Sequence, residues 1–293
     1  MAFFNFCTRR RFVRNALTAA TALELRQAAV ALGFSTQAEM CKLIAEQETG
    51  PFYLQDEMLR SNIREDKAGV PLALKIIVMD AQTCRPVAGA AIDLWHCDAG
   101  GVYSGFTKQH HPGPGGPPPG GPPPGFDAHE RGFDDGPPRG FGPPPAPRPT
   151  DKATSLRGIQ MTAGDGSAHF ETIFPGVYMG RTNHIHFKVR LGGSSDGRSY
   201  QAGHTSHTGQ VFFPEEIAAV LMQSGPYAQN PIRRTTQAED GVFGGQHGES
   251  SIATLRHLKE GFEAELVACV DPLGVPAAIG PGGRRGGPPP PQD

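Results

Sequence analysis

Two histidines one residue apart, His184 and His186, begin an alternation of apolar and basic residues that runs to Leu191. Such alternation predicts a β-strand, and side chains two residues apart on a strand point to the same side of the sheet. The two imidazoles can therefore hold one metal ion between them. Two ordinary histidines on a strand surface are the alternative, and the neighbouring residues bear on the choice.

Arg181 lies three residues before His184, and Tyr178 lies three residues before that. A phenolate is a hard anionic oxygen ligand, which suits ferric iron better than it suits a structural zinc. Arginine always carries its positive charge. A surface salt bridge is one role for Arg181.

A second tyrosine follows a predicted buried strand, Ala90–Trp95. The Gly100-Gly101 turn ends that strand and brings Tyr103 to its exit, where binding groups tend to lie on a rigid scaffold. An ordinary half-buried aromatic residue beside a turn is the alternative.

Together these two motifs resemble the intradiol ring-cleavage dioxygenases. The first reads W-H-x-D-x-x-G-x-Y over residues 95–103, and the second reads T-I-x-P-G-x-Y-x-x-R-x-x-H-I-H over residues 172–186. Lesser matches are Gly50-Pro51-Phe52-Tyr53, Asp165-Gly166 before Phe170, and Gln210. The resemblance covers roughly residues 41–275 apart from one insertion, and it is greatest to small, apparently exported, single-domain members.

The resemblance implies one non-haem Fe(III) ion per chain, held by four ligands: Tyr103, Tyr178, His184 and His186. The enzyme would use O2 to cleave a catechol-type ring between its two hydroxylated carbons, giving a muconate-type diacid. Tyr178 would also act as an internal base, and Arg181 would stabilise developing charge. Gln210 would orient the substrate or an oxygen intermediate, with a strand-edge hydrogen bond as its alternative. A phenol has a pKa of about 10, but a bound cation lowers it, so both tyrosines can bind as phenolates.

Short alternating segments separated by glycine and proline predict an all-β fold, a β-sandwich with short helical additions. The resemblance implies the same fold, with the iron at one end. Candidate strands are Leu72–Met79, Ala90–His96, Gly158–Thr162, Ala168–Ile173, His184–Leu191 and Gln210–Phe213. One late helix is expected over Thr254–Ala268, because Leu255, Leu258, Phe262 and Leu266 have helical spacing.

Three domain segments are expected. Residues 36–275 form the catalytic domain, within which the Gly/Pro-rich insertion 111–150 is expected to be exposed and disordered. The insertion is either a tolerated low-complexity segment or a lid or partner-binding loop. Residues 276–293 form a tail of the same kind. Residues 1–35 contain Thr8-Arg9-Arg10-Arg11-Phe12-Val13-Arg14, which resembles the twin-arginine export motif. We therefore expect a periplasmic or secreted protein, with a basic cytoplasmic N-terminus as the alternative.

Charge and cysteines add further expectations. The net charge of −2 gives no electrostatic footprint for nucleic acid or an anionic membrane, and no apolar run is long enough for a transmembrane helix. Loss of Cys7 with a signal would leave an even set of cysteines. We expect the disulfides Cys84–Cys97 and Cys41–Cys269, with reduced, partly buried thiols as the alternative.

Two other classes of function compete with the dioxygenase. One is a catalytically inactive β-sandwich binding module with at most a structural metal site. The two tyrosines argue against it, since such a module has no reason to keep both phenols beside the histidine pair and Arg181. The other is a zinc hydrolase, which lacks a carboxylate base next to His186. Monomer and homodimer both fit, and the ring substituents of the substrate are not specified.

Overall fold

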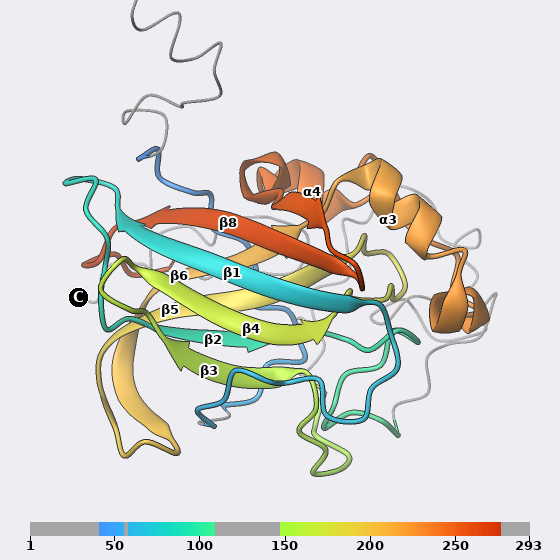
Figure 1. Ribbon diagram of the computed structural model, residues 1–293, viewed down its shortest axis with the longest axis horizontal. Helices are drawn as coiled ribbons and strands as arrows, with labels where there is room; N and C mark the ends of the chain where they lie inside the picture. Colours follow the sequence, from blue (N-terminus) through green and yellow to red (C-terminus); the bar gives the residue numbers. More distant parts are fainter. Residues whose placement is uncertain (1–40, 56–57, 109–146, 277–293) are drawn as a thin grey trace, which may run out of the picture.

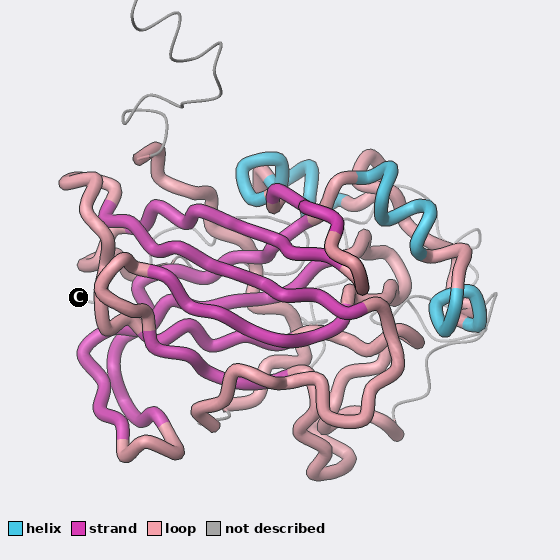
Figure 2. The backbone as a smooth tube through the Cα atoms, in the orientation of Figure 1, coloured by secondary structure: helices cyan, strands magenta, loops and turns pink. Residues whose placement is uncertain are grey.

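The computed structural model describes residues 41–55, 58–108 and 147–276 (Figure 1). These residues form two four-stranded sheets in the orders β4-β1-β8-β7 and β3-β2-β5-β6. Figure 2 shows the strands at the centre of the described chain and the helices grouped toward one side of it. The predicted all-β sandwich with short helical additions is confirmed. The strands of the first sheet are β1 (Pro71–Asp80), β4 (Ser167–Ile173), β7 (Thr254–His257) and β8 (Phe262–Val270). Those of the second are β2 (Ala91–Trp95), β3 (Arg157–Met161), β5 (His184–Ser195) and β6 (Tyr200–Phe212).

The core lies between the two sheets and follows the period-two pattern of the strands. On β5, Ile185, Phe187 and Val189 belong to the hydrophobic core cluster. His184 and His186 alternate with them, so both imidazoles lie on the other face of the sheet, as the spacing predicts. The histidine pair therefore stands outside the core, on a face that other segments must cover.

The six predicted strands are present, with one large difference in length. Strand β6 begins at Tyr200, ten residues before the predicted start at Gln210. Its first half is polar and rich in small residues, so it lacks an apolar pattern of its own; its ladder with β5 extends the strand, across a bulge at Val189 and Arg190. Short helices follow: α3 (Glu215–Leu221), η1 (Gly225–Gln229), α4 (Gly241–Gly245) and η2 (Gly248–Ser251).

The predicted helix over Thr254–Ala268 is wrong, because this segment forms the antiparallel strands β7 and β8. Phe262 and Leu266 are four residues apart, a spacing that fits both a helix face and a strand face. The buried residues of β8 alternate instead, through Ala264 and Ala268. Gly261 has φ +83°, and a Cβ there would collide with the carbonyl of Pro71, so the turn before β8 requires glycine.

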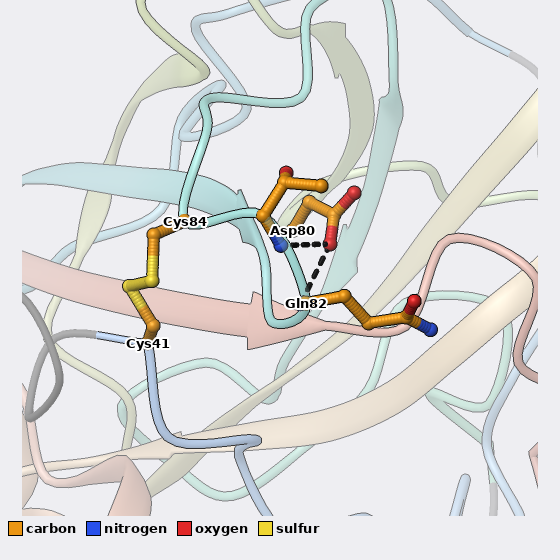
Figure 3. The surroundings of a disulfide bond; sticks show 5 residues. Cys41, Asp80, Gln82 and Cys84 are labelled. Atoms are coloured by element: carbon orange, nitrogen blue, oxygen red, sulfur yellow. Dashed lines mark hydrogen bonds between the residues drawn. A yellow bond between two sulfur atoms is a disulfide. The ribbon is translucent and has the colours of Figure 1, made fainter.

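The predicted disulfide pairs are also wrong, because Cys41 bonds to Cys84 with a Cα–Cα distance of 5.4 Å (Figure 3). Strands β1 and β2 are neighbours in sequence but belong to different sheets, and Cys97 lies with the aromatic residues beyond the far end of β2. The segment that follows Cys41 does approach Cys269, since the N–H of Ile44 donates to the Cys269 carbonyl at 2.9 Å. Cys97 and Cys269 are buried thiols.

The turn that carries Cys84 is organised by Asp80. One carboxylate oxygen accepts the N–H groups of Gln82 at 2.7 Å and Thr83 at 3.1 Å, and the Asp80 carbonyl accepts the N–H of Cys84 at 2.8 Å (Figure 3). The disulfide thus joins an ordered turn to the beginning of residues 41–55, which we call the N-terminal strap (blue in Figure 1).

Breaking this disulfide is expected to lower the free energy of unfolding. It closes a loop with a sequence separation of 43 residues, and loops of this size correspond to about 2–4 kcal/mol. We expect Cys84→Ser and Cys41→Ser to lower the urea midpoint equally, and the double variant to add nothing. Dithiothreitol should shift the wild type but neither variant. An equal effect of the reductant on all proteins would contradict the prediction.

Two buried histidines outside the H-x-H pair are expected to make stability depend on pH. Burial lowers the pKa of His96 and of His207 to about 4, from about 6.5 in an unfolded chain. The unfolded state therefore binds more protons between these values, and stability falls as pH falls from about 6.5 to about 4. The loss is on the order of 3 kcal/mol for each histidine. Urea unfolding from pH 4.5 to 7.5 should show a shallower slope for His207→Leu; an unchanged slope would refute this.

Several expectations fall outside the described residues. These are the export segment 1–35, nearly all of the insertion 111–150, and the tail 276–293 apart from Pro276. Within the part of the chain that the structure describes, no helix is long and apolar enough to cross a membrane.

Candidate metal centre

One row of side chains crosses the outer face of the sheet β3-β2-β5-β6. Arg157 pairs with Trp95, Trp95 with His186, and His186 with Gln210, each directly opposite the next across neighbouring strands. Paired residues on adjacent strands point to the same face. All four are at most 2% exposed, so this face is covered although it lies outside the core.

The N-terminal strap provides the cover. Its Gln47 donates a backbone hydrogen bond to the Thr208 carbonyl at 3.0 Å, and the Gln47 side chain accepts the N–H of Gln210 at 2.7 Å. Farther along, the Phe52 carbonyl accepts a hydrogen bond from Arg157 at 2.9 Å. The strap therefore lies across β6, β5 and β3 and forms one wall of the site.

Three of the four predicted ligands have donor atoms in contact. Nε2 of His184 lies 3.1 Å from Nε2 of His186 and 3.2 Å from the phenol oxygen of Tyr178. The Tyr103 ring lies 5.6 Å from the Tyr178 ring, centroid to centroid. The Tyr103 oxygen is buried and makes no hydrogen bond of ordinary geometry within the described segments. The structure thus brings all four residues together at one end of the sheet.

The protonation states of these groups fit a bound cation. Nδ1 of His184 lies 2.7 Å from the carbonyl oxygen of Thr182, which only accepts, so Nδ1 carries the proton and Nε2 keeps its lone pair. Burial, with the charge of Arg181 acting in the same direction, holds the pKa values of His184 and His186 well below 6.5, so both are neutral. Neutral imidazoles are the form that binds metals.

The phenols need a cation to ionise. Burial raises the pKa of Tyr178 to about 12, although Arg181 opposes the shift, and burial raises the pKa of Tyr103 well above 10. A metal ion bound between them would reverse this and stabilise the phenolates. Among the described residues no cluster of three or more His, Cys, Asp or Glu side chains could hold a metal. The candidate donor set is two imidazoles and two phenols, and hard phenolate oxygens suit Fe(III).

Aromatic rings pack against two of the candidate ligands. Trp95 stacks on His186 with ring centroids 5.0 Å apart and planes within 2°, and Phe52 of the strap stacks on Tyr103 at 4.7 Å. Tyr53 packs on Trp95 at 4.8 Å between ring centroids, and its hydroxyl donates to Asp93 at 2.8 Å. Tyr53 therefore contacts Asp93 and Trp95, and Trp95 in turn stacks on His186.

Gly50 lies in the strap directly against the ring of His186. It has φ +69°, and a Cβ would lie 3.0 Å from Cε1 and 3.3 Å from Nε2 of His186. We expect Gly50→Ala to cost about 1–2 kcal/mol of stability and to displace His186, weakening metal binding. Gly89→Ala is the matched control, because Gly89 has φ +72° and nothing within 4 Å of its Cβ. Equal iron content in the two purified variants would refute the prediction.

Arg181 is 7% exposed, so its ion pair is a buried one and the surface salt bridge is excluded. Nε lies 3.1 and 3.0 Å from the two carboxylate oxygens of Asp240, and Nη2 donates to the side-chain oxygen of Gln210. Nη1 lies 3.5 Å from the Tyr178 oxygen and 3.8 Å from Glu48. Arg181 therefore stands beside the candidate ligands, with its charge turned toward the phenol.

Gln210 is fully buried, and its side chain makes two hydrogen bonds. Its oxygen accepts from Arg181, and its nitrogen donates to the Glu48 carbonyl at 2.9 Å. The structure thus joins Gln210 to Arg181 and to the strap, rather than leaving it as a strand-edge hydrogen bond.

Sequence reasoning missed Asp240 and Glu48. Asp240 lies 59 residues after Arg181, and the only local signal is an aspartate placed to cap a short helix. Glu48 belongs to the strap, whose position across the sheet follows no periodic pattern. Burial raises the pKa of Glu48, while Arg181 opposes that shift.

Comparisons with known proteins bear on the family of this chain. No protein-family model and no curated protein matches the sequence. Among solved structures, the intradiol ring-cleavage dioxygenase from Tetranychus urticae is 30% identical, over 80% of this chain and 98% of that chain, with a TM-score of 0.64. A second solved dioxygenase is 31% identical, over 81% of this chain and 98% of its own, also with a TM-score of 0.64. Agreement in sequence and fold over nearly the whole of both relatives shows that the chain belongs to the intradiol ring-cleavage dioxygenase family.

Proposed function

We propose that this protein is a non-haem Fe(III) dioxygenase that uses O2 to cleave a catechol-type ring between its two hydroxylated carbons, giving a muconate-type diacid. The observation that carries the proposal is the convergence of the Tyr178 phenol and the two Nε2 atoms of His184 and His186, at 3.1–3.2 Å, beside a buried guanidinium. Family membership supports the reaction class. Tyr103, Tyr178, His184 and His186 would hold one iron per chain.

Bound Fe(III) would supply Lewis acidity that draws electron density from a catecholate and so opens its ring to dioxygen. The residues supply the rest. The Tyr178 oxygen would take a proton from a catechol hydroxyl, and burial, which raises the pKa of this phenol, favours its protonated form. Arg181, 3.5 Å from that oxygen, favours negative charge at the same place. Trp95 and Phe52 pack against His186 and Tyr103 and exclude water from them.

The proposal is tested by oxygen uptake with a panel of catechols and by mass spectrometry of the product made under ¹⁸O₂. We expect one O2 consumed per catechol and both labelled atoms in a ring-opened diacid. Removal of the iron should abolish oxygen uptake. Addition of iron should restore the uptake, and addition of zinc should not. Protein that holds iron and consumes no oxygen with any catechol would contradict the proposal.

We also propose export by the twin-arginine route. Two observations support it: the motif around Arg9-Arg10 and the Cys41–Cys84 disulfide, which is typical of proteins in oxidising compartments. Fractionation of cells that produce the full chain should recover it outside the cytoplasm. An Arg9→Lys, Arg10→Lys variant should stay inside; equal distribution of both proteins would contradict export.

A further inference from the structure

Asp240 gathers more hydrogen bonds than a helix cap requires. As the N-cap of α4 it accepts the N–H groups of Val242 at 2.8 Å and Phe243 at 3.2 Å. The same carboxylate also accepts the N–H of Thr182 at 2.9 Å and Nε of Arg181 at both oxygens. Its side chain is fully buried. Asp240 thus joins α4 to the loop between Tyr178 and His184.

These contacts hold two of the three nitrogens of the Arg181 guanidinium. Nε is held by Asp240, and Nη2 is held by Gln210, which is itself anchored to the strap through Glu48. Only Nη1 remains, and it faces the Tyr178 oxygen at 3.5 Å and Glu48 at 3.8 Å. A planar guanidinium fixed along one edge cannot rotate without breaking these bonds.

We propose that Asp240 is a positioning residue, which acts through Arg181 to hold positive charge against the Tyr178 oxygen, an inference that rests on the proposed function. Among the described residues Asp240 makes no hydrogen bond to a candidate ligand, and it reaches the Tyr178 oxygen through the Arg181 guanidinium. Both carboxylate oxygens accept N–H groups, so an amide at this position would set donor against donor in either orientation. Asp240→Asn should therefore release Arg181 although it preserves shape.

A second ion pair offers a matched control. Glu215, in the first turn of α3, binds Arg234 through two bonds of 2.6 and 2.8 Å and accepts the N–H of Gln237 at 3.2 Å. It resembles Asp240 in joining a short helix, an arginine and a loop. Within the described part of the chain, Glu215 makes no hydrogen bond or ion pair with Tyr178, His184 or His186. Glu215→Gln should therefore report what such a pair contributes to stability alone.

The test compares Asp240→Asn, Asp240→Glu and Glu215→Gln with the wild type. The first readout is labelling of Arg181 by phenylglyoxal in the metal-free protein, followed by peptide mass spectrometry. We expect at least about a tenfold faster labelling in Asp240→Asn, a partial effect in Asp240→Glu, and none in Glu215→Gln. The second readout is steady-state kinetics of the iron-loaded proteins. We expect kcat to fall about 100-fold in Asp240→Asn, as displacement of a catalytic group by about 1 Å does, with KM within about threefold.

Wild-type kcat in Asp240→Asn, or a KM effect with kcat unchanged, would overturn the proposal. So would unchanged Arg181 labelling in a folded Asp240→Asn or Asp240→Glu protein, whether or not the enzyme is active. An inactive wild type would instead refute the proposed function, and the labelling result would still decide whether Asp240 holds Arg181.

Discussion

Iron-loaded Tyr178→Phe is expected to lose much of the visible absorption of the wild type and to lose activity by about 10²–10⁴-fold, the range for removal of a general base. Phenolate-to-iron charge transfer gives colour, and the phenol of Tyr178 lies 3.2 Å from Nε2 of His184. Tyr103→Phe should lose the other part of the absorption, and the double variant should be colourless. Phenylalanine preserves the packing of each ring, including that of Phe52 on Tyr103.

Tyr200→Phe is the control for these variants. Tyr200 is also buried, and its hydroxyl accepts the N–H of Gly193 at 3.0 Å, away from the candidate ligands. Loss of that hydrogen bond should cost about 1 kcal/mol of stability and leave colour unchanged. Full absorption in Tyr103→Phe or Tyr178→Phe, with iron content measured, would remove that tyrosine from the ligand set.

Replacement of Arg181 is expected to have the second largest effect. Arg181→Lys keeps a positive charge but cannot bond Asp240, Gln210 and Tyr178 from one plane, so we expect kcat to fall by about 10²–10³ while colour is retained. Arg181→Ala should lose activity to the same degree or more. It should also lose about 3–5 kcal/mol of stability, because Asp240 would keep a buried charge without its partner.

Arg234→Lys separates the two effects, since Arg234 pairs with Glu215 and not with the ligands. It should lower the unfolding midpoint and keep kcat within about twofold, a change expected for a partly exposed pair. Steady-state kinetics and urea unfolding of the three variants check this account. Wild-type kcat in Arg181→Ala would show that the guanidinium has no part in the reaction.

The sequence predicts the part of the site that lies close together along the chain. The H-x-H spacing determines that His184 and His186 share a face, and the loop before them brings Tyr178 and Arg181 to the same end. Tyr103 follows from the strand and turn that precede it. These residues are close to one another in sequence, so a short motif is enough to predict their relative positions.

The missed features are all long-range. Asp240 contacts Arg181 across a sequence separation of 59 residues, and Gln47 of the strap contacts Gln210 across 163 residues. Contacts at such separations leave no periodic pattern in the sequence. The disulfide prediction failed because chain neighbours β1 and β2 lie in different sheets. The helix prediction over Thr254–Ala268 failed because a four-residue spacing fits a helix and a strand alike, and pairing with β1 selected the strand.

The most direct test of the central claim is the visible spectrum of the iron-loaded protein before and after anaerobic addition of catechol. We predict a broad charge-transfer band, because both phenols would bind Fe(III), and a shift of that band to longer wavelength when the substrate chelates the metal. A featureless spectrum in protein confirmed to contain iron would mean that Tyr103 and Tyr178 are not ligands, and would contradict the account.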